Sequence, residues 1–107
     1  MYSAPVRAKR VVSGLLLTPG AGADRDQPAL VAVDQAASSL GLSVERIDFP
    51  YRLAGRKRPD AAPVLVDTVV SATHALAARV GVGTDSILLG GRSMGGRICS
   101  MAALWSG

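Results

Sequence analysis

The sequence predicts an α/β fold in which a mainly parallel sheet forms the middle layer of a three-layer sandwich. Three short apolar segments alternate with three segments of helical periodicity over residues 11–105. Strands that alternate with helices of this length are joined by crossover connections, which make the strands parallel and place helices on both faces of the sheet. The 107 residues, of which 49% are hydrophobic, suffice to bury one core, so we expect a single domain over 1–107.

The first half of the chain contains two expected strands around one expected helix. Residues 11–18, VVSGLLLT, form a short apolar run that ends at a Pro-Gly pair, which is typical of a strand buried on both faces. Apolar residues recur at helical spacing over 27–40, and the glycine that follows is a common helix stop. Over 43–49, apolar and charged side chains alternate, which predicts a more exposed strand.

The second half begins with a basic loop and continues to a third strand and a last helix. Residues 50–63 contain three prolines and four basic residues, which indicates a surface loop. Apolar positions then fall on one helical face over 64–80, and two glycines follow. The run SILLGG, 86–91, predicts the third strand, and 95–105 has the periodicity of a helix.

The turn between the third strand and the last helix matches the pattern G-x-S-x-G. Within residues 91–95 the serine is Ser93 and the two glycines are Gly91 and Gly95. A strand that turns directly into a helix strains the residue at the apex and brings the residues two before and two after it into close contact, so only very small side chains fit. Such a turn raises the serine hydroxyl above the sheet at a helix N-terminus, where a developing negative charge is favoured. The pattern therefore predicts a nucleophile elbow.

Two other interpretations of this segment stay open. In the first, Ser93 simply caps the helix that follows a glycine-rich turn. In the second, the segment binds nucleotide phosphates, although Arg97 stands where a P-loop has its lysine and Ile98 where it has Ser or Thr. The loop after the first strand similarly has Arg25 in place of the third glycine of the dinucleotide fingerprint.

A second loop of small residues, TPGAG, follows the first strand at residues 18–22. Acyl transfer requires two N–H donors at the oxyanion, one from the residue after the nucleophile and one from a loop after another strand. Met94 and Ala21 occupy these two positions. The two loops meet at one edge of the sheet if the first and third strands are neighbours, with the second strand on the far side of the first. We therefore predict an oxyanion hole from these two residues.

The segments LLLTPGAGAD, VERIDFPYRLAGRKRPD and LLGGRSMGGRICSM resemble the dienelactone-hydrolase-like branch of the α/β-hydrolase superfamily. That branch includes bacterial hydrolases, testis-expressed protein thirty and regulatory subunit three of the NSL acetyltransferase complex. The resemblance implies the N-terminal portion of an α/β-hydrolase fold, with Ser93 as the nucleophile and Met94 and Ala21 at the oxyanion-hole positions. It implies a serine hydrolase that acts on a small ester, thioester or lactone. The chain departs from the family at Pro19, where members often carry histidine.

The acid and the base of a catalytic triad do not follow the elbow. The triad of an α/β-hydrolase has the chain order Ser, Asp or Glu, then His, and this sequence has none of the last three after Ser93. The sole histidine, His74, shares a polar helix face with Asp67 and Ser71, which indicates a solvated surface. We therefore expect an N-terminal fragment of a longer hydrolase. The alternatives are a noncatalytic interaction module of the same fold and, more remotely, a nucleotide-binding domain.

Composition limits the cofactors and the compartment. One cysteine and one histidine can form neither an internal disulfide nor a zinc site of three or four protein ligands. We therefore expect no metal, no cofactor and a cytoplasmic location, with Cys99 as a buried structural thiol. The basic and then apolar N-terminus resembles a signal peptide, but Ser13 and Gly14 interrupt its short apolar stretch, which a strand explains better.

The expected partner is a small ester-type substrate. The formal net charge of +4 and the basic loop would attract anions, but the sequence holds no nucleic-acid-binding module and few aromatic residues, so no specific nucleic-acid binding is expected. No apolar segment reaches the roughly 20 residues of a membrane span, so no membrane partner is expected. An exposed edge of the sheet would allow self-association.

Overall fold

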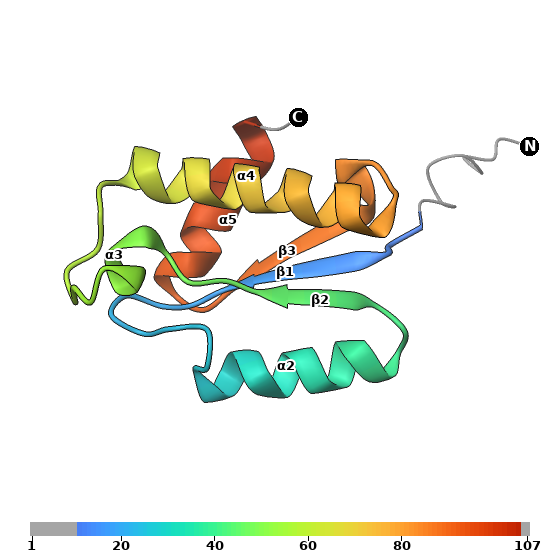
Figure 1. The fold of residues 1–107 in the computed structure, drawn as a ribbon, viewed down its shortest axis with the longest axis horizontal. Coiled ribbons are helices and arrows are strands. Elements are labelled where there is room, and N and C mark those ends of the chain that lie inside the picture. The colour runs from blue at the N-terminus through green and yellow to red at the C-terminus, as the bar shows by residue number, and fades with distance from the viewer. Residues whose placement is uncertain (1–10, 106–107) are drawn as a thin grey trace, which may run out of the picture.

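A computed structural model describes residues 11–105 and shows a parallel sheet between two layers of helices (Figure 1). The predicted α/β class is confirmed. The three strands have the order β2-β1-β3, and both neighbours of β1 run parallel to it. In chain order the elements are β1 (Gly14–Thr18), α2 (Pro28–Ser39), β2 (Ser43–Arg46), α3 (Pro50–Leu53), α4 (Ala62–Val80), the 3-10 turn η1 (Thr84–Ser86), β3 (Ile87–Gly91) and α5 (Met94–Trp105).

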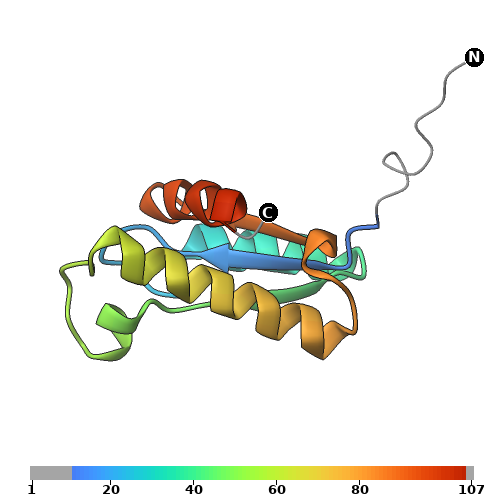
Figure 2. The same ribbon diagram turned by 90° about the horizontal axis from the view of Figure 1, so that it is seen from above.

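The core is divided by the sheet into two parts. Helix α2 covers one face, and α4 and α5 cover the other (Figures 1 and 2). Side chains of β1 alternate between the faces: Leu15 and Leu17 pack with Leu30 of α2, whereas Leu16 belongs to the larger cluster under α4 and α5. All five residues of β1 are buried, as expected of a central strand covered on both faces.

The apolar face predicted for α4 packs against the sheet. Leu65, Val69 and Leu76 are buried, and Thr73 joins them because its hydroxyl donates a 2.7 Å hydrogen bond to the Val69 carbonyl of its own helix. The helix ends where Gly81 takes the left-handed conformation, with φ +86°.

The strands are shorter than the sequence pattern suggests. The strand expected over 11–18 begins at Gly14, which pairs with Ser43 and Ile87; Ser13 before it still donates to the Ser86 carbonyl at 2.8 Å and accepts from the Ser43 N–H at 3.1 Å. The strand expected over 43–49 ends at Arg46, and one further ladder bond follows, from the Ile47 N–H to the Leu17 carbonyl at 3.1 Å. The strand expected over 86–91 begins one residue later, since residues 84–86 form a 3-10 turn.

The segment 50–63, expected to be a loop, starts with the short helix α3. Pro50 occupies the first turn, where its fixed φ and missing N–H are tolerated, and Tyr51 is fully buried. Helix α4 likewise begins at Ala62 rather than residue 64, with a proline in its first turn. The prediction of a loop over 50–63 is therefore wrong at both ends, because proline starts helices in this part of the chain. At the other helices the differences are one residue at each end of α2 and one at the start of α5.

Candidate active site

Ser93 lies at the turn between β3 and α5 with φ +51°. Among residues 11–105 no other non-glycine residue has a positive φ. An L-residue in this left-handed region costs about 1–2 kcal/mol, which the surrounding structure has to offset. The turn is closed by a 2.8 Å hydrogen bond from the Gly95 N–H to the Arg92 carbonyl, and the Ser93 carbonyl then accepts a bond from the Arg97 N–H at 3.2 Å. The Ser93 side chain is exposed.

The two glycines of the pattern lie where no side chain fits. A Cβ on Gly91 would come within 2.6 Å of the Gly96 backbone nitrogen. A Cβ on Gly95 would lie 2.6 Å from the Thr18 carbonyl oxygen and 2.7 Å from that of Pro19. These are backbone atoms, which cannot move aside as a flexible side chain can. The close contact expected across the turn is therefore present, and residues at the end of β1 also pack closely against Gly95.

Thr18, the last residue of β1, fills the space beneath the turn. Its carbonyl accepts a 3.0 Å hydrogen bond from the Arg92 N–H, and its fully buried hydroxyl donates to the Gly90 carbonyl at 3.3 Å. The hydroxyl also lies 3.4 Å from the Cys99 Sγ of α5. Burial raises the pKa of the Cys99 thiol above its ordinary value, so this group stays a neutral part of the core. No local sequence pattern indicates this role of Thr18, because its partners lie 72 and 81 residues away in the chain.

The loop after β1 approaches the elbow from the side. A Cβ on Gly20 would lie 3.8 Å from the Ser93 Cβ, which places this loop beside the serine. The Ala23 N–H donates to the Gly20 carbonyl at 3.1 Å, and Gly22 has φ +75°, which together define a type II turn with glycine at its third position. The strand order β2-β1-β3 brings the two loops to one edge of the sheet, where the carboxyl ends of β1 and β3 lie (left side of Figure 1).

In the loop after β1, two backbone N–H groups have hydrogen-bond acceptors, and the N–H group between them has none among the described residues. The Gly20 N–H donates to the Gln27 Oε1 at 3.0 Å, and the Gly22 N–H donates to the Tyr51 hydroxyl at 2.9 Å. Within residues 11–105, the N–H of Ala21 between them has no acceptor, and neither has the N–H of Met94 that follows Ser93. The two groups predicted to form an oxyanion hole thus both lack an internal partner within this range.

No acid or base of the described residues contacts the serine. His74 lies on the exposed side of α4 with Asp67 and Ser71, as their spacing predicted, and no hydrogen bond over residues 11–105 joins any of them to Ser93. No group of three or more His, Cys, Asp or Glu side chains in the described part of the chain could hold a metal ion. No helix among the described residues is long and apolar enough to cross a membrane.

Part of the basic loop is neutralised by nearby carboxylates. Arg56 pairs with Asp60 at 3.2 Å, and Arg52 lies 3.9 Å from Asp24. Arg97 is exposed one turn into α5 and has no carboxylate partner within the described range. Lys57 and Arg58 of the loop have no carboxylate partner in this range either, so both segments carry unpaired positive charge.

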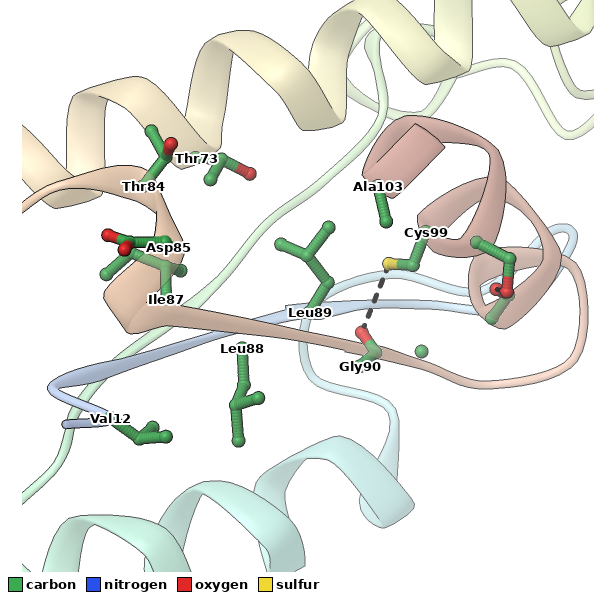
Figure 3. Close-up of a pocket in the computed structure, with 13 residues that line it drawn as sticks. Val12, Thr73, Thr84, Asp85, Ile87, Leu88, Leu89, Gly90, Cys99 and Ala103 are labelled. Atoms are coloured by element: carbon green, nitrogen blue, oxygen red, sulfur yellow. Dashed lines mark hydrogen bonds between the residues drawn. The ribbon is translucent and has the colours of Figure 1, made fainter. Parts of the chain in front are cut away.

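A groove of about 610 Å³ lies along the outer edge of β3 and does not include Ser93. Figure 3 shows Leu88 and Leu89 pointing to opposite sides of β3, with Val12 near the first and Cys99 and Ala103 of α5 near the second. Among the described residues β3 pairs with β1 alone, and the groove lies along its unpaired edge. The groove and the elbow are therefore separate features.

Two features together are typical of the α/β-hydrolase class. One is a parallel sheet covered by helices on both faces, and the other is a serine at a strained strand-to-helix turn with a free backbone N–H in the loop beside it. The chain belongs to the alpha/beta hydrolase domain family, whose sequence model matches residues 12–106. No curated protein and no solved structure matches the chain. The narrower resemblance to the dienelactone-hydrolase-like branch stays a prediction.

Proposed function

We propose that this chain is a serine hydrolase in which Ser93 attacks a small ester, thioester or lactone. The observation that carries the proposal is the φ of +51° at Ser93, in a turn where Gly91 and Gly95 have no room for a Cβ. A serine that only caps a helix has extended backbone angles and needs no such conformation, so the capping interpretation is disfavoured. The free Met94 and Ala21 N–H groups support the same proposal.

In the proposed reaction the Ser93 Oγ forms a bond to the carbonyl carbon of the substrate, and the carbonyl π electrons move to its oxygen. The Ala21 and Met94 N–H groups donate to this oxyanion. Collapse of the intermediate expels the alcohol or thiol, which takes up a proton, and water then releases the acid from the acyl-enzyme. The Ser93 proton requires a base, and no residue of 11–105 accepts a hydrogen bond from this hydroxyl. The chain therefore supplies the nucleophile and the oxyanion donors of the mechanism.

A fluorophosphonate probe tests the proposal. The Ser93 Oγ would displace fluoride from phosphorus, and mass spectrometry would locate the single adduct on the peptide that contains Ser93. Ser93→Ala should abolish the adduct, whereas Ser100→Ala, which removes an exposed hydroxyl of the same helix, should leave it unchanged. Absence of an adduct on the folded protein, or equal labelling of Ser93→Ala, would contradict the proposal. Because a serine without a base is a weak nucleophile, we expect labelling to be slow and to need excess probe, and ester turnover by this chain to stay near the uncatalysed rate.

The second candidate is a noncatalytic interaction module that keeps the hydrolase fold. It is favoured by one observation: the single histidine of the chain, His74, is on the exposed side of α4 and makes no hydrogen bond to Ser93. A folded protein that the probe does not label would support this candidate over the hydrolase.

The first proposal also includes membership of the dienelactone-hydrolase-like branch, which the three resembling segments support. It includes a cytoplasmic location as well, which the free, buried thiol of Cys99 supports.

A further inference from the structure

We propose that Gln27 and Tyr51 are positioning residues that hold the loop after β1 so that Ala21 is the backbone donor this loop offers to an oxyanion. The inference rests on the proposed nucleophilic role of Ser93 and deepens it. It concerns two side chains that lie outside the G-x-S-x-G pattern and make no hydrogen bond to Ser93. Each accepts a hydrogen bond from one of the two N–H groups that flank Ala21.

Tyr51 is anchored in the core and reaches the loop from a distant segment. The residue is fully buried, and its ring stacks on Phe49 with centroids 6.4 Å apart. Its hydroxyl accepts the Gly22 N–H at 2.9 Å across a separation of 29 residues. Helix α3, which carries Tyr51, is only four residues long and begins at a proline. Because the ring is fixed by packing, its hydroxyl gives the loop a rigid point of attachment.

Gln27 holds the other side of the loop from the start of α2. It occupies the N-cap position of that helix, yet its side chain makes no capping hydrogen bond. Ser, Thr, Asp and Asn are the residues favoured at such a position, so a glutamine there gives up a stabilising contact for α2. Its Oε1 accepts the Gly20 N–H at 3.0 Å instead. The Gln27 side chain therefore stabilises the loop after β1 rather than the N-terminus of α2.

The hydrogen bonds made by Gln27 and Tyr51 leave Ala21, within the described part of the chain, as the one free N–H donor among the three consecutive residues 20–22. The N–H groups of Gly20, Ala21 and Gly22 follow one another in a turn that lies beside Ser93. With the outer two engaged, the turn cannot rotate to offer either of them to a substrate without breaking a hydrogen bond. Donors that are held before the substrate arrives stabilise a developing charge without reorganisation at the moment of reaction. The pair of side chains would thus preorganise the oxyanion hole.

Amide hydrogen exchange measured by NMR on the full chain tests the geometry directly. The Gly20 and Gly22 amides should exchange at least about tenfold more slowly than that of Ala21, because only they donate to internal acceptors. Tyr51→Phe should remove the protection of Gly22, and Gln27→Met that of Gly20. Equal exchange of the three amides in the unchanged protein would overturn the inference.

The rate of fluorophosphonate labelling tests the consequence at Ser93. Tyr51→Phe and Gln27→Met should each slow labelling by about tenfold or more, because misaligned donors lose much of their effect. Gln27→Glu keeps an acceptor at the same place and should label at close to the rate of the unchanged protein. Leu76→Val is the control for stability, since it removes buried volume from α4 but neither a hydrogen bond to the loop nor the stacking of the Tyr51 ring.

The outcomes separate this inference from the proposed function. If both acceptor-removing variants fold and label at the unchanged rate, the positioning role is wrong even though Ser93 is a nucleophile. If Leu76→Val slows labelling as much as Tyr51→Phe does, general destabilisation explains the effect and the inference fails. If Ser93 is not labelled at all, the proposed function fails, while the exchange pattern still decides whether the two side chains hold the loop.

Discussion

Ser93 combines two properties that seldom coexist in one residue: it is exposed, and its backbone is held in an unfavourable conformation. The fold maintains this conformation through contacts on the other side of the turn, chiefly from Thr18, whose carbonyl accepts the Arg92 N–H. The free energy lost at one residue is therefore offset by neighbours that take no part in the proposed chemistry. Such a conformation, held by its surroundings, is common at functional sites.

Replacement of Ser93 by glycine should increase the stability of the protein and abolish its reactivity with the probe. Ser93→Gly should raise the free energy of unfolding by about 1 kcal/mol, because glycine adopts a positive φ without steric cost. The same variant should lose all fluorophosphonate labelling. Urea denaturation monitored by circular dichroism provides the measurement, with Ser93→Ala, which keeps the Cβ and its strain, as the control. A Ser93→Gly protein no more stable than Ser93→Ala would show that the turn is not strained.

The first turn of α5 and the end of β1 form one unit at the scale of secondary structure. Carbonyl oxygens of Thr18 and Pro19 point at Gly95, and the hydroxyl of Thr18 bridges to Gly90 and Cys99. The position of the helix relative to the sheet is thereby set at its N-terminal end. Glycine, which normally weakens a helix, is required here because the strand approaches so closely.

Alanine at position 95 should destabilise the protein, although alanine usually stabilises a helix relative to glycine. In an ordinary exposed helix, alanine in place of glycine stabilises by about 1 kcal/mol. Gly95→Ala should instead lower the free energy of unfolding by about 3 kcal/mol, since its Cβ would lie 2.6 Å from the Thr18 carbonyl oxygen. Thermal and urea unfolding would measure the effect, and Ser100→Ala in the exposed part of the same helix should change stability by less than about 0.5 kcal/mol. A neutral Gly95→Ala would rule out the close approach.

The number and type of the larger elements follow from periodicity in the sequence, but their ends do not. Apolar runs and helical spacing predict the three strands and three long helices, and the G-x-S-x-G pattern predicts the place of Ser93. Strand ends depend on where the neighbouring strands stop, which no local pattern contains. The contact between Tyr51 and Gly22 joins residues 29 apart, and Thr18 gains its role from a helix 81 residues later, so neither is visible before the chain is folded.

At the scale of the whole molecule, the two outer strands differ in how their edges are protected. Strand β2 carries charge: Arg46 pairs with Asp34 at 2.8 Å, and Glu45 pairs with Arg79 at 2.7 Å. Strand β3 has no charged residue, and its Leu88 is 51% exposed beside the groove of Figure 3. Charged side chains on an edge strand oppose pairing with other chains, so the β3 edge is the one open to association.

We expect the chain to self-associate through the β3 edge in a concentration-dependent manner. Leu88→Lys should weaken this association by about tenfold or more, because an edge lysine has to be desolvated when two strands pair. Sedimentation velocity over a range of protein concentrations would measure the dissociation constant. Val33→Lys, which changes an exposed apolar side chain on α2, is the matched control. A chain that stays monomeric throughout, or that responds equally to both variants, would contradict this expectation.

The space beneath the elbow has a consequence for how this sequence can vary. Thr18 Oγ1 lies where a Cβ of either Gly91 or Gly95 would be, so these three positions, far apart in the chain, share one small volume. Substitutions within such a shared volume have non-additive effects on stability. A smaller residue at 18 would relieve only part of the crowding, because Gly91 also faces backbone atoms of Gly95 and Gly96, and Gly95 also faces two carbonyl oxygens. A change at either glycine of the G-x-S-x-G turn would therefore require both a smaller residue at the end of β1 and a shift of the backbone.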